Sequence, residues 1–230
     1  MKRRTTNIIR WLMDELVPAF IRDSYIFMWP FYVLAYRTWT PGQYMTFKSN
    51  VFKMSPNDYS DFYNDLNSIS RNRLTDNNEE CINAIINDCA KVRNVLDVGC
   101  GRGYVLRELH SALPNVSLVG VDLLRSTTDT VFGYVASAAN NLPFRDNSFD
   151  VVCCTHVIEH VVDPASVVAE LVRVARKMVI IVTPKQRPYY FTLDEHINFF
   201  LYREQLERLV QNGERDTKLL SGDWYMVISK

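Results

Sequence analysis

The sequence predicts an α/β fold: a doubly wound, mostly parallel sheet of about seven strands with flanking helices, preceded by a helical extension. Three observations lead to this prediction. Short apolar segments rich in Val and Ile recur from about residue 93 onward, as in buried parallel strands. Segments with helical periodicity separate them. The first apolar segment runs into a glycine-rich turn over residues 99–103, and a helical pattern follows that turn.

Composition is that of a cytoplasmic, soluble protein with one main core. The chain has 230 residues, 47% of them hydrophobic, which suffices for one sizeable α/β core and an appendage. Lys+Arg and Asp+Glu balance at 26 each, so no chain-wide basic field argues for nucleic-acid binding. The five cysteines follow no metal or disulfide spacing, and we expect reduced, buried, intracellular thiols at positions 81, 89, 100, 153 and 154.

The chain divides near residue 75 into an N-terminal helical cover, 1–74, and an α/β domain, 75–230. In the cover, apolar residues recur at helical spacing from Ile9 to Phe20, and an aromatic run follows over 25–32. The uncharged stretch before Arg37 is shorter than the roughly 18–20 residues of a membrane span. The basic start, residues 2–4, precedes an amphipathic pattern, so we expect no signal peptide. Two interpretations stay open: a lid over the cofactor cleft or a sheet edge, and a peripheral membrane or partner contact.

The remaining elements follow from local signals. Ser55-Pro56 is a typical helix start, and Thr75 is expected to cap a helix that runs to about Ala90. Asp163-Pro164 opens another helix, with an apolar face at Val167, Val168, Leu171 and Val174. Strands are expected at about 93–98, 117–122, 131–135, 149–154 and 177–183.

The end of the chain is predicted to contain a late helix and one closing strand. The helix spans Leu201 to Val210 and is ended by Gly213, and the strand spans Trp224 to Ser229. Only some seventeen residues follow Gly213, so we expect this edge of the sheet to be compressed.

The glycine-rich turn indicates a ligand site. Glycines at 99, 101 and 103 allow tight turning and close approach of a ligand, because no Cβ is present. A dinucleotide fingerprint, G-x-G-x-x-G, needs a third glycine where Tyr104 stands. Asp97 just before the turn suits a cationic amino group. A second acid, Asp122, ends the next strand, where nucleotide-binding folds hold ribose hydroxyls.

The pattern Asp97-x-Gly99-x-Gly101-x-Gly103 resembles motif I of the class I S-adenosylmethionine (SAM) dependent methyltransferases. Residues 142–150, with Leu-Pro-Phe followed by Asp-x-Ser-Phe-Asp, and 157–161, Val-Ile-Glu-His-Val, resemble the segments that flank strand four in the small-molecule, methyltransferase type 11-like subgroup. The resemblance covers roughly residues 75–210. It implies a Rossmann-like sheet, SAM as cofactor, and methyl transfer to an oxygen of a small or lipid-like metabolite.

The resemblance also implies roles for individual residues. The acid at 97 and the loop backbone would hold the methionine part of SAM, the acid at 122 its ribose, and Leu123 its adenine. Family members often carry Asp-Ala where this chain has Ala138-Ala139, so side-chain recognition of adenine is lost there. The residues expected to contact the cofactor are Asp97, Gly99, Cys100, Gly101, Asp122, Leu123, Ala138, Ala139 and His156.

Methyl transfer depends mainly on positioning the acceptor, but a hydroxyl acceptor must also lose a proton. His196, in the segment 194–200 after strand five, is the favoured base or substrate contact, because a neutral imidazole removes protons near pH 7. His156 is a second catalytic candidate.

A divalent-metal site is an alternative use of the same residues. His156, Glu159 and His160 would share one face if their segment were helical, and His196 could complete an N/O ligand set. Small-RNA 2′-O-methyltransferases and some quinone O-methyltransferases look similar here, but their first ligand is Glu where this chain has His156. Metal-free relatives share the Glu-His pair, and we expect no metal.

Two other classes of function stay open. A nicotinamide-dependent oxidoreductase would need the glycine that Tyr104 replaces. A non-catalytic scaffold or activator subunit would fit eroded cofactor contacts, which Ala138 favours and the intact Asp97 and Asp122 oppose. The acceptor is a small molecule, and the aromatic residues over 25–32 and 189–191 suggest an apolar or planar one, although packing within a lid explains them equally well.

Overall fold

The computed structural model describes most of the chain, in two compact units. One unit comprises residues 1–76 and 188–197, and the other comprises residues 77–187 and 198–230. Nothing in the sequence pattern indicated that residues 188–197 group with the N-terminal segment. The described residues are 13, 16–66, 74–123, 131–191 and 193–230.

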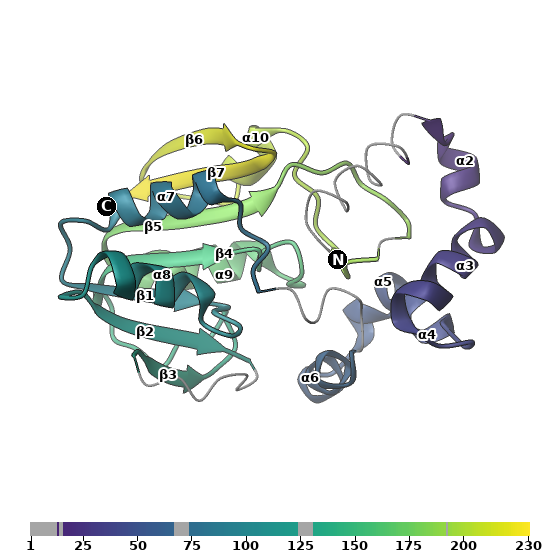
Figure 1. The fold of residues 1–230 in the computed structure, drawn as a ribbon, viewed down its shortest axis with the longest axis horizontal. Helices are drawn as coiled ribbons and strands as arrows, with labels where there is room; N and C mark the ends of the chain where they lie inside the picture. The colour runs from purple at the N-terminus through teal and green to yellow at the C-terminus, as the bar shows by residue number, and fades with distance from the viewer. Residues whose placement is uncertain (1–12, 14–15, 67–73, 124–130, 192) are drawn as a thin grey trace. The chain divides into compact units, whose positions relative to one another are not determined.

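The larger unit is built on a seven-stranded sheet with the order β3-β2-β1-β4-β5-β7-β6 (Figure 1). Strands β1 to β5 are parallel, whereas β7 is antiparallel to β5 and β6 is antiparallel to β7. This is the doubly wound α/β sheet that the sequence predicts. The strands are β1 Asn94–Val98, β2 Ser117–Asp122, β3 Gly133–Ala136, β4 Phe149–Thr155, β5 Ala175–Pro184, β6 Glu214–Leu220 and β7 Asp223–Ser229.

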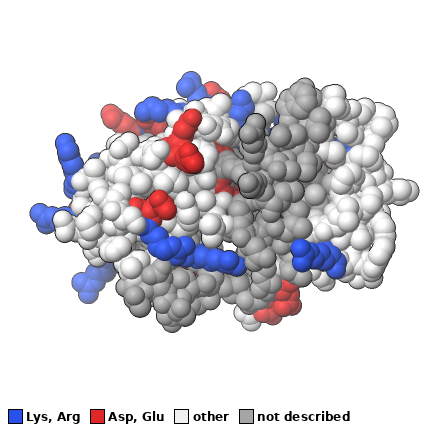
Figure 2. Space-filling model, in the orientation of Figure 1, with Lys and Arg blue, Asp and Glu red and all other residues white. Residues whose placement is uncertain are grey.

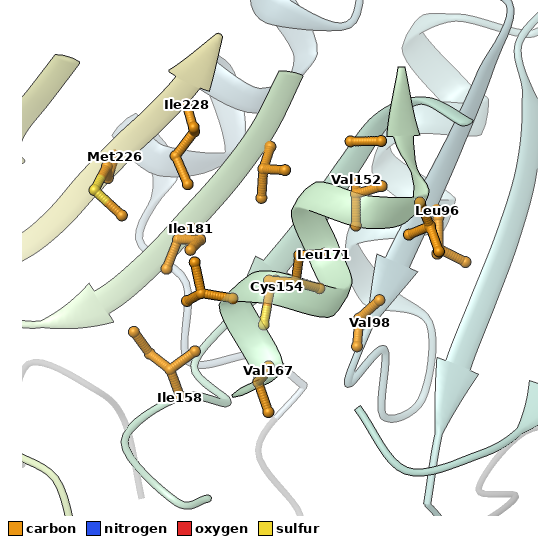
Figure 3. Packing of buried hydrophobic residues seen from close by; sticks show 14 of the residues in the cluster. Leu96, Val98, Val152, Cys154, Ile158, Val167, Leu171, Ile181, Met226 and Ile228 are labelled. Carbon is orange, nitrogen blue, oxygen red and sulfur yellow. The ribbon is translucent and has the colours of Figure 1, made fainter. Parts of the chain in front are cut away.

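Successive side chains of the central strands pack alternately into two hydrophobic cores, one on each face of the sheet. Leu96 and Val152 belong to the core that includes helices α9 and α10, and Figure 3 shows both beside Leu171 of α9. Their neighbours Val95 and Val151 belong to the core of α7 and α8. Because successive strand residues point to opposite faces, the sheet is covered on both sides. The helices are α7 Glu79–Asp88, α8 Tyr104–Ala112, α9 Pro164–Val174 and α10 Arg203–Glu207.

The prediction of a compressed edge was wrong. β6 and β7 form a complete hairpin of two seven-residue strands around Ser221-Gly222. Both turn residues have positive φ, 45° and 93°, as a two-residue hairpin of the primed type requires. β6 has few apolar residues and lies at the sheet edge with mostly exposed side chains, so it lacks the hydrophobic pattern that marks a strand in sequence.

Two helix boundaries also differ from the prediction. The cap of α7 is Asn78, not Thr75: its side chain accepts a hydrogen bond of 2.8 Å from the Cys81 amide. The late helix α10 is shorter than 201–210. The start of α9 is confirmed, since Asp163 accepts from the Ser166 amide at 3.1 Å and Pro164 follows it. All five cysteines are free and buried.

The smaller unit is mainly helical over residues 16–66, whereas its described residues in 188–197 form neither helix nor strand. A core of Met28, Tyr32, Ala35, Tyr36, Met45 and Phe191 holds it together. The predicted start at Ser55 is confirmed by a capping box with Asp58. Of the pattern over residues 9–20, Ile9 and Leu12 lie outside the described residues, whereas Met13 packs against this core and Leu16 and Phe20 are exposed. No described helix is both long and apolar enough to cross a bilayer. The elements are α2 Ala19–Arg22, α3 Tyr25–Tyr36, α4 Gly42–Met45, α5 Phe47–Asn50, the 3-10 helix η1 Val51–Lys53 and α6 Pro56–Asp65.

Candidate functional site

The candidate site lies where the carboxyl ends of the parallel strands meet. The sheet order passes from β2 through β1 to β4, so connections leave β1 and β4 toward opposite sides. An open α/β sheet binds ligands at this switch point, outside the strand ends. Asp97 is the fourth of the five residues in β1, and Asp122 is the last residue of β2. The two predicted cofactor acids therefore come from neighbouring strands at one edge.

The glycine loop after β1 takes a conformation that needs glycine. Gly99, Gly101 and Gly103 have φ of +76°, +51° and +77°. A Cβ on Gly99 would come within 2.1 Å of Val157, and one on Gly103 within 2.2 Å of the Phe132 ring. A Cβ on Gly101 would meet nothing within 4 Å among the described atoms. Gly99 and Gly103 therefore serve close packing, whereas Gly101 leaves its space open to a ligand.

Hydrogen bonds fix this loop to the end of β2. The amides of Gly99 and Cys100 donate to the carbonyl of Val121 at 2.7 and 3.0 Å. The amide of Gly101 donates to Oδ2 of Asp122 at 2.7 Å. The carboxylate at the end of β2 thus holds the loop in place, and it remains half-buried beside it.

Asp97 carries a buried carboxyl group. Its side chain is 1% exposed, and burial together with the charge of Asp122 raises its pKa to about 7. Its Oδ1 has no hydrogen-bond partner among the described residues. A buried carboxylate without a partner is costly, and a positively charged ligand group would stabilise it.

The other predicted cofactor residues surround this pair. The Cys100 sulfur packs against Gly120, and burial raises the pKa of its thiol. Because the side chain is occupied by this packing, we expect a ligand to contact the backbone of Cys100. Leu123 is 36% exposed directly after β2. Ala138 and Ala139 are half-buried in the turn after β3, where the Ala138 carbonyl accepts from the Asn141 amide at 3.1 Å.

His156 follows β4 in a left-handed conformation with φ of 55°. Its Nδ1 lies 3.2 Å from Oε1 of Glu159, and its Nε2 lies 3.6 Å from Oδ2 of Asp223. Burial opposes a charge on this imidazole, but the two carboxylates outweigh burial and raise its pKa to about 9. At neutral pH the ring is an imidazolium, which neither accepts a proton nor binds a metal.

The helical face predicted for His156, Glu159 and His160 is absent. Residues 158–160 form a turn, closed by the His160 amide on the Val157 carbonyl at 2.9 Å. The helix that would create the shared face is therefore absent, although one ligand atom of Glu159 lies within 4.8 Å of one of His160. The fourth residue of the alternative metal set, His196, belongs to the smaller unit.

A buried polar network surrounds the His156 side chain, and sequence reasoning missed most of it. Thr183 of β5 donates to Glu159 at 3.1 Å, and Asn78 donates to Asp223 at 2.9 Å. Asp223 begins β7, whose pairing with β5 is a long-range contact. The tight Ser-Gly turn before Asp223 was the one local signal that could have located it.

The predicted base His196 has an acidic neighbour within the smaller unit. It is 6% exposed, and its Nδ1 lies 3.4 Å from Oδ2 of Asp194. Glu195, which stands between Asp194 and His196 in the sequence, has φ of 55° and accepts a hydrogen bond from the hydroxyl of Tyr36. Burial raises the pKa of Glu195 to about 8, although the bond from Tyr36 opposes the shift.

A partly buried lysine and aromatic rings belong to the same unit. Lys48 donates to the carbonyl of Tyr189 at 2.6 Å, and burial lowers its pKa to about 8. Phe191 makes edge-to-face contacts with Tyr25 and Tyr32, each with ring centroids 6.2 Å apart. The segment 188–197 therefore combines titratable groups with an aromatic ring that packs against the rings of α3.

Comparison with known proteins agrees with this arrangement. Residues 96–183, from β1 to β5, match the family model described as "Methyltransferase domain". A ubiquinone biosynthesis O-methyltransferase of Aliivibrio fischeri (strain MJ11) is 32% identical over 139 residues, which cover 54% of this chain and 56% of that protein. The chain thus spans about half the length of the curated relatives it matches.

Solved structures share the fold. The plantazolicin methyltransferase BpumL, solved with a monoazolic desmethylPZN analog and SAH, superposes with a TM-score of 0.57 at 12% identity, covering 75% of this chain and 93% of that one. A proposed methyltransferase from an antibiotic biosynthesis pathway of Anabaena variabilis gives a TM-score of 0.54 at 19% identity, covering 64% and 67%. At these identities the likeness establishes the Rossmann-like methyltransferase fold.

Proposed function

We propose that the chain carries a class I SAM-dependent methyltransferase domain, and that it transfers the methyl group of SAM to an oxygen atom of a small, apolar or planar metabolite. The observation that carries this proposal is the pairing of Asp97 with Gly101. Asp97 provides a buried carboxylate whose Oδ1 lacks a hydrogen-bond partner among the described residues, and Gly101 provides a stretch of backbone with open space beside it. Bound SAM supplies a methyl group on a positively charged sulfur.

The residues at the strand ends fit this cofactor. The carboxylate of Asp97 would neutralise its ammonium group, and the loop backbone at Gly99, Cys100 and Gly101 would lie against its methionine part. The carboxylate of Asp122 would accept from ribose hydroxyls. Leu123, Ala138 and Ala139 are proposed for the adenine.

For the acceptor we propose His196 as the base. The carboxylate of Asp194 near Nδ1 favours the tautomer with its proton on that nitrogen and the lone pair on Nε2, the atom that we propose accepts the hydroxyl proton of the acceptor. Removing this proton makes the acceptor oxygen a better nucleophile. His156 is not assigned this role, since its two carboxylates keep it protonated. Its place in the cofactor set stays a prediction.

Oxygen is proposed as the acceptor atom on two grounds. The curated relatives are named as O-methyltransferases. The smaller unit presents aromatic rings beside titratable groups, a combination that suits a planar molecule bearing a hydroxyl. We further propose that no metal takes part: Oε2 of Glu159 accepts a hydrogen bond from Thr183 at 3.1 Å, which fits the structural use of the Glu-His pair in metal-free relatives. The buried, free cysteines support a reducing, cytoplasmic setting.

The experiment has two stages. Calorimetric titration with SAM tests the cofactor site on the wild type, on Asp97→Asn and on Asp150→Asn. Asp150 is a matched control: it is also 1% exposed, but it is paired with Arg176 and Lys177 near the start of β4. A screen of hydroxylated metabolites for SAM consumption follows, with and without chelator. SAM binding that is lost only in Asp97→Asn supports the proposal, and no SAM binding by the wild type overturns it.

A further inference from the structure

Helix α3 carries a line of exposed apolar side chains. Ile26, Pro30 and Leu34 are four residues apart, so they follow one another along a single face of the helix. Ile26 is 85% exposed and Leu34 is 74% exposed. We name these three residues the α3 stripe. The helix has no charged residue, and its buried positions, Met28, Tyr32, Ala35 and Tyr36, face the core of its own unit.

Aromatic side chains extend this apolar surface. Trp39, just beyond α3, is 80% exposed, and its ring centroid lies 6.4 Å from that of Trp29. Phe52 of η1 is 65% exposed. Indole rings have an apolar body and a polar N–H, which favours the boundary between lipid and water. Scattered exposed apolar residues are ordinary, but a line on one uncharged helix with a tryptophan pair is a typical interaction surface.

The charged residues within 24–57 have one sign, and Asp23 just before this range lies 3.9 Å from Arg22. Residues 24–57 contain no Asp or Glu, and they contain Arg37, Lys48 and Lys53. Arg37 ends α3, and both Arg37 and Lys53 are exposed. On the face shown in Figure 2, the described surface of this unit is mostly uncharged. Apolar groups flanked by cations match the interface of a membrane that contains anionic lipids.

We propose that α3 and Trp39 bind in the plane of an anionic phospholipid surface, with the α3 stripe inserted at the boundary between headgroups and acyl chains. The helix has 12 residues, or about 18 Å at 1.5 Å per residue, which suits an in-plane position and is too short for the roughly 30 Å hydrocarbon core. Charge complementarity favours a lipid surface over a second copy of the chain, because two copies would bring the cations together. The proposal does not depend on methyl transfer.

The test is flotation of the full chain with vesicles of phosphatidylcholine alone and with vesicles that also contain phosphatidylglycerol. Wild type is expected to float with the anionic vesicles. The double variant Ile26→Gln/Leu34→Gln is expected to lose binding by at least about ten-fold. Leu219→Gln is the matched control, since Leu219 is 47% exposed on β6 of the other unit, and it should bind as wild type does. All three positions are exposed, and circular dichroism verifies that each variant is folded.

A second pair of variants tests whether positive charge contributes to vesicle binding. Arg37→Gln/Lys53→Gln is expected to weaken binding to anionic vesicles by about five-fold per cation, whereas Lys91→Gln/Arg145→Gln, at exposed positions of the other unit, should leave it unchanged. The proposal is overturned if wild type floats with neither vesicle, or if the stripe and control variants lose binding equally. It is also overturned if the stripe mediates a dimer in sedimentation velocity while vesicles bind nothing.

Discussion

The amide of Gly101 donates a hydrogen bond of 2.7 Å to Oδ2 of Asp122, and this bond joins the glycine loop of β1 to the end of β2. The same carboxylate acts electrostatically on Asp97, whose pKa burial and Asp122 together raise to about 7. The glycine loop, Asp122 and Asp97 are therefore linked by a hydrogen bond and by charge. Substitutions at Gly101 and at Asp97 should each weaken cofactor binding, and different measurements distinguish their effects.

Gly101→Ala should weaken cofactor binding without unfolding the protein. The added methyl group meets nothing within 4 Å, and its left-handed φ costs about 1–2 kcal/mol, but it fills the proposed cradle. We expect SAM affinity to fall at least about ten-fold in calorimetry.

Gly222→Ala is the matched control, because Gly222 also has positive φ and open space but lies in the β6–β7 turn. It should lose similar stability and keep SAM affinity. Gly99→Ala, which collides with Val157, should lose about 2–4 kcal/mol of unfolding free energy. If Gly101→Ala binds SAM as wild type does, the cradle has been placed wrongly.

SAM affinity should depend on pH through Asp97. Only the ionised carboxylate pairs with a cation, and the pKa of this group in the free protein is about 7. Affinity should therefore be highest above pH 7 and fall up to about ten-fold per pH unit below it. Calorimetry in buffers of different ionisation enthalpy should detect proton release on binding near pH 6. Asp97→Asn should bind weakly with no such proton release, and an unchanged pH dependence in that variant would refute the assignment.

His156 should stabilise the fold below about pH 9. Its pKa is raised in the folded state, so its contribution is complete below the unfolded value of about 6.5 and disappears as pH rises through about 9. His156→Gln should lower the free energy of unfolding by on the order of 3 kcal/mol at pH 6, and by much less at pH 9.5. Urea unfolding across this range measures the difference. His110→Gln on α8 is the control, and a penalty for His156→Gln that does not change with pH would contradict the ion pairs.

His196→Ala should reduce kcat about 10²–10⁴-fold, the usual contribution of a general base, while SAM affinity stays unchanged. Asp194→Asn should have a smaller effect on kcat, since it removes the group that orients the imidazole. Turnover should be insensitive to chelator. Turnover measured with any acceptor from the screen decides this point: wild-type kcat in His196→Ala would dismiss the base, and chelator sensitivity would restore the metal alternative.

The site on β1 and β2 could be predicted from sequence because its signals are local. Gly99, Gly101 and Gly103 are the residues that tolerate positive φ, and all three adopt it. The acids at 97 and 122 end apolar strands, and parallel strands bring their carboxyl ends to one edge. The doubly wound, seven-stranded sheet that the family resemblance implies is confirmed by the observed topology.

The remaining features depend on contacts between distant residues. The cap of α7 is Asn78 because its amide also reaches Asp223 and the Leu220 carbonyl, which the sequence near Thr75 does not indicate. The charge of His156 depends on Asp223, which is 67 positions later in the chain and reaches it only through β5–β7 pairing. A polar edge strand such as β6 has no hydrophobic periodicity, so turn chemistry was its one local signal.

Calorimetric titration of SAM into the wild-type chain and into Asp97→Asn, at pH 7.5, tests the central claim most directly. We predict one SAM site per chain in the wild type and in Asp150→Asn, SAM binding at least about ten-fold weaker in Asp97→Asn, and no binding of NADH to any of them. Absence of heat with SAM in the folded wild type, or SAM affinity that Asp97→Asn leaves unchanged, would contradict it.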